Sequence, residues 1–218
     1  MTPTGPVTLI PANRLDRAKG RLAELLTPAE RARLALATLE TVIAAARPVS
    51  RRVAVLTADE TVTATATSLG CNVVRESPEL DGLNGQIQGA VEALDHPADL
   101  LILHADLPLA TSTALSDLVA SAPPLPSVTI VRSGDGGTNA LLLRPSKGFA
   151  YAYGRGSAAL HLAAAERLGY GTALHASSSL TLDLDMPADV RAFLAARGSG
   201  ETRAGRVLAE IGVAARLG

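Results

Sequence analysis

The sequence predicts an α/β fold, with a mainly parallel sheet and helices on both of its faces. The first observation behind this prediction is that short apolar runs alternate with helix-like segments along almost the whole chain. That pattern is typical of consecutive strand and helix units. The second observation is size. With 218 residues, 47% of them hydrophobic, the chain can bury one sizeable core, and its length requires no second domain.

The first half of the chain supplies three predicted strands and the helices between them. Strand 7–11 comes first. The segment 27–30 (Thr-Pro-Ala-Glu) then provides a cap, a proline at the first helical position and an acid three residues after the cap, which predicts a helix that ends near Pro48. A threonine- and alanine-rich helix runs to Gly70, a typical helix stop. The other two strands of this half are residues 53–57 and 72–74.

The second half continues the alternation. An apolar strand over residues 100–105 closes at Asp106, and a glycine-rich turn separates two later strands. Residues 182–186 also have a strand-like pattern, which is cut off by the helix-starting Pro187. The predicted helices are residues 84–94, 112–120, 157–168 and 187–196, and the strands beside the turn are residues 128–131 and 140–143.

After residue 197 the chain changes to a glycine- and serine-containing stretch, followed by an amphipathic piece with Val207, Leu208 and Ile211 on one face. We therefore expect a main domain over residues 1–197 and a C-terminal tail over residues 198–218 that forms a short helix. Either the domain or a second subunit would receive the apolar face of this helix, so a homodimer is one expectation.

Composition argues against two classes of partner. The net charge is −1 and aromatic residues make up 2% of the chain, so we expect neither a basic surface nor a stacking platform for nucleic acid. The apolar run at residues 7–10 is too short for a signal peptide or a membrane span. We therefore predict a cytoplasmic protein that does not bind membranes.

Cys71 is the single cysteine, and we interpret it as a small core residue.

Three carboxylates are the strongest candidates for chemistry. Asp183 and Asp185 stand two positions apart, so on a strand their side chains would point the same way, ~6–7 Å apart. Asp106 closes the strand at 100–105. Oxygen ligands at two strand ends suit a hard cation such as Mg²⁺. For each acid alone, an equally good explanation is a local one: Asp185 and Asp189 would favour the helix after Pro187, and Asp106 would begin a turn. The combination favours metal binding.

The loop over residues 11–22 follows the first strand and carries several cations. In open α/β sheets ligands bind beyond the carboxyl ends of the strands, so Lys19 and Arg21 are placed to hold a triphosphate and stabilise its leaving group. Without the nearby acids, a solvated basic loop would be the better explanation. The loop contains neither the phosphate-binding P-loop pattern nor the Gly-x-Gly-x-x-Gly dinucleotide turn.

Glycine-containing turns supply further candidates. Residues 82–85 precede a helix and allow close approach of Asn84 to a base or ribose. The turn at 134–139 delivers a hydroxyl and an amide into the next strand. Residues 154–157 (Gly-Arg-Gly-Ser) lie directly before a helix, where free amides favour a phosphate or carboxylate. An equally good explanation is that Ser157 simply caps that helix.

No general base stands out in the sequence. His96, His104, His161 and His175 lack neighbours at ligand spacing, and we interpret all four as structural or surface residues. No nucleophile elbow or Cys/His arrangement is present, which disfavours covalent hydrolysis. The absence of a base fits a nucleophile that is already ionised. A phosphate oxygen that attacks an α-phosphorus needs alignment and charge neutralisation rather than proton removal.

Taken in order and spacing, these motifs resemble the guanylyltransferases of coenzyme F₄₂₀ biosynthesis, the CofC or FbiD family. The resemblance runs over residues 7–194. The motifs that carry it are residues 18–22 (Ala-Lys-Gly-Arg-Leu), 82–84 (Gly-Leu-Asn), 105–108 (Ala-Asp-Leu-Pro), 137–141 (Gly-Thr-Asn-Ala-Leu), 153–157 (Tyr-Gly-Arg-Gly-Ser) and 182–187 (Leu-Asp-Leu-Asp-Met-Pro). Together they are far more specific than any one of them.

The resemblance implies a Rossmann-like, nucleotide-diphosphosugar-transferase-like (GT-A-like) fold. It implies a nucleotidyltransferase whose main domain joins GMP from GTP to phosphoenolpyruvate, 2-phospho-L-lactate or 3-phospho-D-glycerate, with release of pyrophosphate. The product would pass to the downstream transferase of the pathway. The implied catalytic residues are Lys19, Arg21 and Asp106; the nucleotide-binding residues are Pro11, Ala12, Asn13, Lys19, Leu83 and Asn84; the acid-binding residues are Thr138, Gly154 and Ser157; and the Mg²⁺ ligands are Asp106, Asp183 and Asp185.

Two departures from the family pattern keep alternatives open. The family usually has a lysine where Asn13 stands and often a serine or threonine where Gly20 stands. One alternative is another nucleotidyltransferase of the same fold, of the molybdopterin or sugar-phosphate type, although their glycine-rich Leu-Ala-Gly-Gly-like loop is absent here. Another is a nucleotide-binding regulator without catalysis, which Asn13 favours and the three acids oppose. Phosphoenolpyruvate is the favoured acid because bacterial relatives commonly use it.

Overall fold

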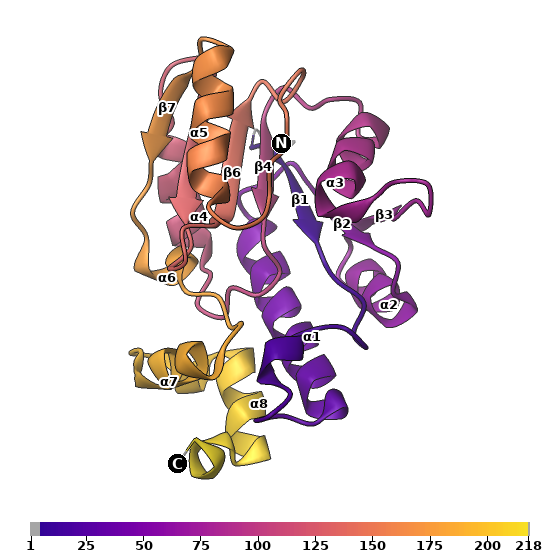
Figure 1. The fold of residues 1–218 in the computed structure, drawn as a ribbon, viewed down its shortest axis with the longest axis vertical. Coiled ribbons are helices and arrows are strands. Elements are labelled where there is room, and N and C mark those ends of the chain that lie inside the picture. Colours follow the sequence, from indigo (N-terminus) through magenta and orange to yellow (C-terminus); the bar gives the residue numbers. More distant parts are fainter. Residues whose placement is uncertain (1–4, 218) are drawn as a thin grey trace.

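Seven strands form one sheet at the centre of the molecule (Figure 1). The structure, a computed structural model, describes residues 5–217; residues 1–4 of the predicted main domain and residue 218 of the predicted tail lie outside this range. The strand order across the sheet is β3-β2-β1-β4-β6-β5-β7. The strands are β1 (Val7–Pro11), β2 (Arg52–Thr57), β3 (Asn72–Arg75), β4 (Leu100–Leu103), β5 (Ser127–Arg132), β6 (Thr138–Arg144) and β7 (Gly171–Leu174).

The directions of the strands bring the end of β4 and the start of β6, which both carry candidate site residues, to the same edge of the sheet. The β1, β2, β3 and β4 strands are parallel, and β5 pairs in parallel with β7. β6 runs antiparallel to both β4 and β5. The prediction of a mainly parallel sheet is therefore confirmed. Because β6 is reversed, its first residues lie beside the last residues of β4, and the His104 amide donates to the Asn139 carbonyl over 3.0 Å.

Helices cover both faces of the sheet, as predicted, and each face has its own core. On one face, apolar side chains of α1 (Pro28–Ala46), α2 (Glu60–Ser68) and α4 (Ser112–Ala120) pack against the strands. On the other, α3 (Gly82–Ala93) and α5 (Ser157–Arg167) do so. The predicted start of α1 is confirmed, because Thr27 and Glu30 form a reciprocal capping box. No helix of the described chain combines the length and apolarity needed to span a bilayer.

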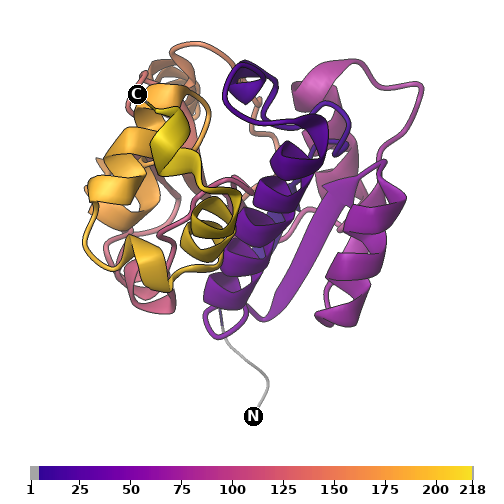
Figure 2. The same cartoon turned by 90° about the horizontal axis from the view of Figure 1, so that it is seen from below.

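A third core joins the loop after β1 to the C-terminal segment. Figure 2 shows part of this segment (yellow) alongside α1. The third core contains buried side chains of α7 (Pro187–Ala195) and α8 (Arg203–Ile211), and α8 packs against α1. Three short 3₁₀ turns complete this part: η1 (Gly20–Leu22), η2 (Ser199–Glu201) and η3 (Val213–Arg216). Leu22, Phe193 and Leu208 are fully buried there. This core holds the lysine-bearing loop by packing rather than by regular pairing.

The structure corrects the prediction at residues 182–186. This segment has extended dihedral angles at its start but joins no strand, because β7 takes the sheet edge beside β5. A hydrogen bond 3.3 Å long, from the Leu184 amide to the Asp106 carbonyl, connects this segment to the loop after β4. The sequence pattern did not predict β7, whose residues are mostly exposed, or the four-residue α6 (Ser178–Thr181). β4 ends at Leu103, two residues before its predicted end.

Candidate active site

The site lies where the direction of the strand order changes, between β1 and β4. From β1 the chain builds outward to β2 and β3, whereas β4 leads to the other half of the sheet. Such switch points are the usual ligand crevices of open α/β sheets. A cavity of about 140 Å³ opens here. Its wall combines the loops after β1 and β4 with α1, α2, α3 and the segment before α7, through Pro11, Ala12, Asn13, Leu15, Ala18, Lys19, Ala35, Thr38, Leu39, Val62, Leu83, His104, Ala105, Asp106 and Asp185.

Lys19 brings a positive charge into this cavity. Its side chain is only 5% exposed, and its Nζ atom lies 2.8 Å from Asp106 Oδ2 and 3.5 Å from Asp185 Oδ1. The Lys19 backbone has φ 53°, in the left-handed region that non-glycine residues rarely adopt. The fully buried Leu22 follows one turn later. Packing of Leu22 thus holds the strained lysine backbone in place and aims the ammonium at the acids.

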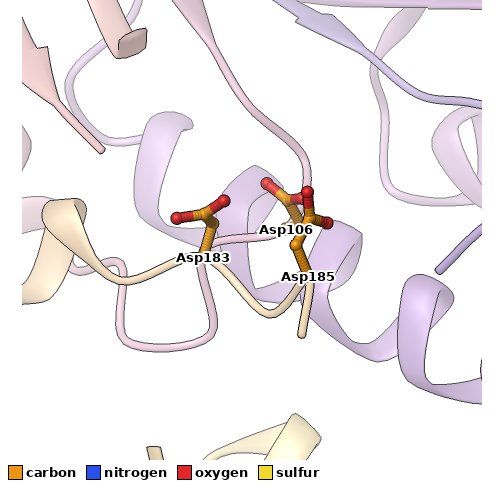
Figure 3. A group of neighbouring side chains, drawn as sticks. All are labelled: Asp106, Asp183 and Asp185. Atoms are coloured by element: carbon orange, nitrogen blue, oxygen red, sulfur yellow. The ribbon is translucent and has the colours of Figure 1, made fainter. Parts of the chain in front are cut away.

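The three predicted metal ligands come together. Asp106, Asp183 and Asp185 each offer a carboxylate oxygen, and these oxygens all lie within 4.8 Å of one another (Figure 3). Asp185 faces Lys19, so helix capping does not account for it. Asp189 instead organises the start of α7: its Oδ2 atom accepts hydrogen bonds of 3.0 Å from the Asp185 amide and 2.6 Å from the Met186 amide.

The pKa values of two acids show how little positive charge this cluster contains. Burial, with Asp106 and Asp185 close by, raises the pKa of Asp183 to about 6. Burial acts in the same direction on Asp106, but Lys19 and His104 together outweigh it and hold the pKa of Asp106 below its ordinary value. Lys19 therefore compensates only part of the negative charge. A hard divalent cation fits the remaining negative charge, because the donors are all carboxylate oxygens and the buried Oδ1 atom of Asp106 has no hydrogen-bond partner among residues 5–217.

Arg21 lies at the rim of the cluster. Its side chain is 68% exposed, and its Nη1 atom is 3.9 Å from Asp185 Oδ2. Asn13, at the position where the family usually has a lysine, is exposed and lines the cavity. The nearby Arg14 pairs with Asp16 rather than with the cluster. The sequence thus places two cations at the acids, with Lys19 inside and Arg21 outside.

Two features in and around the cavity were not predicted from the sequence. Asp59 accepts a 2.9 Å hydrogen bond from the Leu15 amide and also caps α2 through Thr61 and Val62, which fixes the loop after β1. The second is His104, which lines the cavity. Within the part of the chain that the structure describes, its buried Nε2 atom has no hydrogen-bond partner, and its ring lies 5.5 Å from that of Tyr153. A histidine two residues before a strand-ending acid was the available signal.

Leu83 and Asn84, in the first turn of α3, differ in role. Leu83 lines the cavity and is 40% exposed, so its side chain is free to contact a ligand. The amide of Asn84 instead contacts the backbone of Tyr153. Asn84 Nδ2 donates to the Tyr153 carbonyl over 3.1 Å, and Asn84 Oδ1 accepts from the Tyr153 amide over 2.7 Å. This pair ties α3 to the loop that leads into α5.

The predicted acid-binding residues form a second, adjoining group. Thr138, at the start of β6, and Ser157, at the start of α5, are buried and hydrogen-bonded to each other over 2.9 Å. Gly154 has φ 137°, a conformation that favours glycine. The amides of the first α5 residues already have backbone acceptors; the Ser157 amide, for example, donates to the Gly154 carbonyl. The hydroxyls, rather than free helix amides, are thus the notable polar groups of this region.

Sequence comparison identifies related enzymes. A family model described as "Guanylyl transferase CofC like" matches residues 7–216. The phosphoenolpyruvate guanylyltransferase of Nocardia farcinica is 36% identical over 100% of this chain and 96% of its own length. The 2-phospho-L-lactate guanylyltransferase of Methanothermobacter thermautotrophicus is 34% identical over 84% of this chain and 81% of its own. The 3-phospho-D-glycerate guanylyltransferase of Phenylobacterium zucineum is 33% identical, with coverages of 89% and 91%.

Comparison of structures confirms the predicted fold. The crystal structure of a candidate nucleotide-diphospho-sugar transferase from Desulfovibrio desulfuricans G20 superposes with a TM-score of 0.73, covers 97% of each chain and has 12% sequence identity. At that identity the likeness concerns the fold alone. The family itself follows from the sequence matches, since the model spans nearly the whole chain and the relatives exceed 30% identity over most of it. This chain belongs to the CofC-like guanylyl transferase family.

Proposed function

We propose that this protein transfers the guanylyl group of GTP to a three-carbon phospho-acid and releases pyrophosphate. The observation that carries the proposal is the position of Lys19, whose ammonium stands between Asp106 and Asp185 at the cavity wall. A cation beside clustered carboxylates at a topological switch point suits a polyphosphate and its counterion. Membership of the CofC-like family supports guanylyl transfer in particular.

The chemistry balances without a base. A phosphate oxygen of the acid, ionised at neutral pH, forms a bond to the α-phosphorus of GTP, and the bond from that phosphorus to the bridging oxygen of the β-phosphate breaks. The electron pair leaves with pyrophosphate. Lys19 and the more exposed Arg21 are suited to neutralise the charge on the triphosphate and on the leaving group. The unpaired His104 is not needed as a base for this reaction.

Asp106, Asp183 and Asp185 would hold Mg²⁺, as the donor set and the unpartnered Asp106 oxygen support. When bound, the ion supplies charge neutralisation for the phosphate oxygens. Lys19 would then have to give up part of its contact with the acids, and its ammonium would be released toward the nucleotide phosphates. The ion pair seen here would thus keep the site compact until both ligands arrive.

The cavity accommodates part of the nucleotide. Its volume of about 140 Å³ is below the ~300–1,000 Å³ that is typical of whole small-molecule sites. We assign it to part of the nucleoside, with Ala12 and the exposed Leu83 as apolar contacts, while the phosphates extend over Asn13 and Lys19. The bidentate contact of Asn84 with Tyr153 makes this residue a support of the wall rather than a direct contact to the base.

For the acceptor we favour phosphoenolpyruvate, the substrate named for the Nocardia relative. Thr138, Gly154 and Ser157 would bind the acid. Because relatives are named for three different acids, the choice depends on a few polar contacts around these residues. We further propose that the enzyme acts in coenzyme F₄₂₀ biosynthesis in the cytoplasm, and that it hands its product to the next transferase of the pathway. Homodimer formation also stays a proposal, which light scattering of the purified protein tests.

The function is tested with purified protein, Mg²⁺ and GTP, offered separately with phosphoenolpyruvate, 2-phospho-L-lactate and 3-phospho-D-glycerate. Pyrophosphate release is followed continuously, and mass spectrometry identifies the guanosine-diphospho-acid. The expected result is turnover with one acid, phosphoenolpyruvate first. ATP and CTP serve as matched controls for the base. Silence with all three acids in folded protein would contradict the proposal and favour another nucleotidyltransferase or a non-catalytic regulator.

A further inference from the structure

Three buried side chains from β6 and α5 form one hydrogen-bonded group beside the proposed acid site. His161 is fully buried, and Thr138 and Ser157 are at most 2% exposed. Thr138 Oγ1 lies 3.0 Å from His161 Nδ1 and 2.9 Å from Ser157 Oγ. The sequence pattern gives His161 no role in the site. Its burial against two hydroxyls that the family resemblance assigns to the acid raises the question of what it does there.

The partners of His161 determine which of its ring nitrogens donates a hydrogen bond and which accepts one. The backbone amide of Ala152 can only donate, and it lies 3.0 Å from His161 Nε2. His161 Nε2 therefore accepts and carries no proton. Burial lowers the pKa of His161 to about 4, so the ring is neutral near pH 7 and its single proton is on Nδ1. The Nδ1–H group consequently donates to Thr138 Oγ1.

Thr138 receives a second hydrogen bond, from the Ser157 hydroxyl. A hydroxyl oxygen has two lone pairs and one proton, so both acceptor positions of Thr138 are filled and only its own proton remains for a further partner. Among residues 5–217, no hydrogen bond has this hydroxyl as its donor. An anionic oxygen, which accepts but never donates, is the complementary ligand.

The surroundings of His161 favour the neutral form and hold the ring still. The Tyr153 ring packs edge-on at 4.8 Å between centroids, and the Phe149 ring lies at 5.9 Å. His104 acts on His161 electrostatically and disfavours its charged form. The described chain shows no carboxylate within hydrogen-bonding reach of either ring nitrogen. The ring therefore has one tautomer and one orientation available.

We propose that His161 is a positioning residue of the acid site: it fixes the Thr138 hydroxyl as a dedicated donor to an anionic oxygen of the phospho-acid. This inference rests on the proposed function, since it takes the acid as the ligand of Thr138. His161 itself does not contact the substrate. Its effect should therefore fall on the acid and leave GTP almost untouched, which a merely structural residue would not do.

Two substitutions separate the two nitrogens. In His161→Asn the side-chain amide takes the place of Nδ1 and still donates to Thr138, whereas in His161→Gln the carbonyl oxygen reaches the place of Nε2 and still accepts from Ala152. We expect His161→Gln to raise KM for the acid about tenfold or more, the effect of one charge-assisted hydrogen bond. KM for GTP should change less than twofold, and His161→Asn should lie closer to the wild type.

Thr138→Val supplies the second variant. It keeps the shape of the side chain and removes the hydroxyl, so it should raise KM for the acid as His161→Gln does. The double variant should be no worse than Thr138→Val alone, because His161 acts through that hydroxyl. His96→Asn is the matched control: His96 lies at the opposite edge of the sheet with φ 43°, which asparagine tolerates.

Two measurements decide the proposal even if turnover is absent. Long-range ¹H–¹⁵N spectra of the full protein should show the Nδ1–H tautomer for His161, and calorimetry with phosphoenolpyruvate and Mg²⁺ should show weaker binding by His161→Gln. The Nε2–H tautomer, or equal binding of the acid by both proteins, overturns the inference. Loss of affinity for GTP and the acid alike would also overturn it. Silence of the wild type in the transfer assay with normal acid binding would count against the proposed function alone.

Discussion

Lys19 Nζ lies 2.8 Å from Asp106 Oδ2, and both side chains are largely buried, at 5% and 22% exposure. Desolvating the two charges of such a buried ion pair is costly. Removal of one partner strongly destabilises the fold, because it leaves the other charge buried and uncompensated. The position of this ion pair gives it a structural role. The ammonium lies where Asp106 and Asp185 converge, so it joins the loop after β1 to Asp106 after β4 and to Asp185 before α7.

Lys19→Gln separates the two roles of this lysine. The variant should lose at least about 100-fold in kcat with GTP and acid, because a preorganised charge on the leaving group is gone. It should also bind Mn²⁺ more tightly than the wild type, since the ammonium no longer competes for the carboxylates. Steady-state kinetics and calorimetry measure the two effects. Arg17→Gln, an exposed cation of the same loop, is the control, and weaker Mn²⁺ binding by Lys19→Gln would contradict the prediction.

Asp183→Asn should raise stability while it abolishes turnover. In the metal-free protein the pKa of Asp183 is raised from 3.8 to about 6, so the folded state holds a proton that the unfolded chain releases. This residue therefore destabilises the fold progressively as the pH rises from 4 to 6, and the effect persists at pH 7. With EDTA at pH 7, the variant should be more stable on the order of 1 kcal/mol, allowing for partial solvent screening.

Thermal unfolding at pH 5 and pH 7 measures this effect. The advantage of Asp183→Asn should shrink at the lower pH. Mg²⁺ should raise the Tm of the wild type and have much less effect on the variant, because one ligand is lost. A variant that turns over at the wild-type rate would remove Asp183 from the proposed metal site.

The acids and Lys19 were predictable because their signal is local. Asp106 and Lys19 follow β4 and β1 in the sequence, and parallel strands bring their ends to one edge. Asp183 and Asp185 stand two positions apart directly before Pro187, although their segment is not a strand. The third core was harder to predict from the sequence, because Leu22 and Leu208 are far apart in the chain and come together only in the folded protein. Residues 182–186 have a strand pattern but join no sheet, since a short alternation does not state whether a partner strand is available.

The supporting contacts of the site were not predictable from local pattern. Asn84 and Tyr153 are 69 positions apart, and Thr138 and His161 are 23 positions apart. Their pairing follows from how α3 and α5 pack on the same face of the sheet. The reversed strand β6 is equally decisive, because it brings Thr138 to the edge where the parallel strands end. Tertiary position, rather than residue type, gives these side chains their roles.

Asn84→Ala tests whether this residue supports the site or contacts the base. Loss of both hydrogen bonds to the Tyr153 backbone should loosen the loop before α5, so KM for the acid should rise several-fold. The free energy of unfolding should fall by about 1–3 kcal/mol, because a partly buried amide and carbonyl lose their partners. Leu83→Ala, by contrast, should raise KM mainly for GTP. Kinetics with each substrate varied and urea unfolding provide the measurements, and a GTP-specific defect in Asn84→Ala would show direct nucleotide contact instead.

His161 should make the stability of the protein depend on pH. Its pKa is about 4 in the folded protein against ~6.5 in an unfolded chain. The unfolded chain therefore takes up a proton first as the pH falls, and the stability contributed by the neutral ring is complete above pH ~6.5 and is lost toward pH 4. The total corresponds to about 3 kcal/mol. Urea unfolding of the wild type and His161→Gln should give curves that converge toward low pH; a constant difference between pH 4.5 and 7.5 would mean that His161 titrates normally.

Leu208→Ala tests whether the C-terminal helix supports the metal ligands. Leu208 of α8 is fully buried in the third core, together with Leu184, which stands between Asp183 and Asp185 in the chain. The substitution should cost about 2–5 kcal/mol of stability, as is typical when a buried leucine is truncated. Because the truncated side chain leaves a void in the core that also contains Leu184, Mg²⁺ affinity should fall as well, in protein that is still folded. Leu160→Ala, at a leucine that is 51% exposed on α5, controls for the change in composition and should leave both properties within error. Calorimetric Mn²⁺ titration at 15 °C, where the weakened fold persists, decides the point: unchanged affinity in Leu208→Ala would mean that the acids are held by the Asp106 and Asp189 contacts alone.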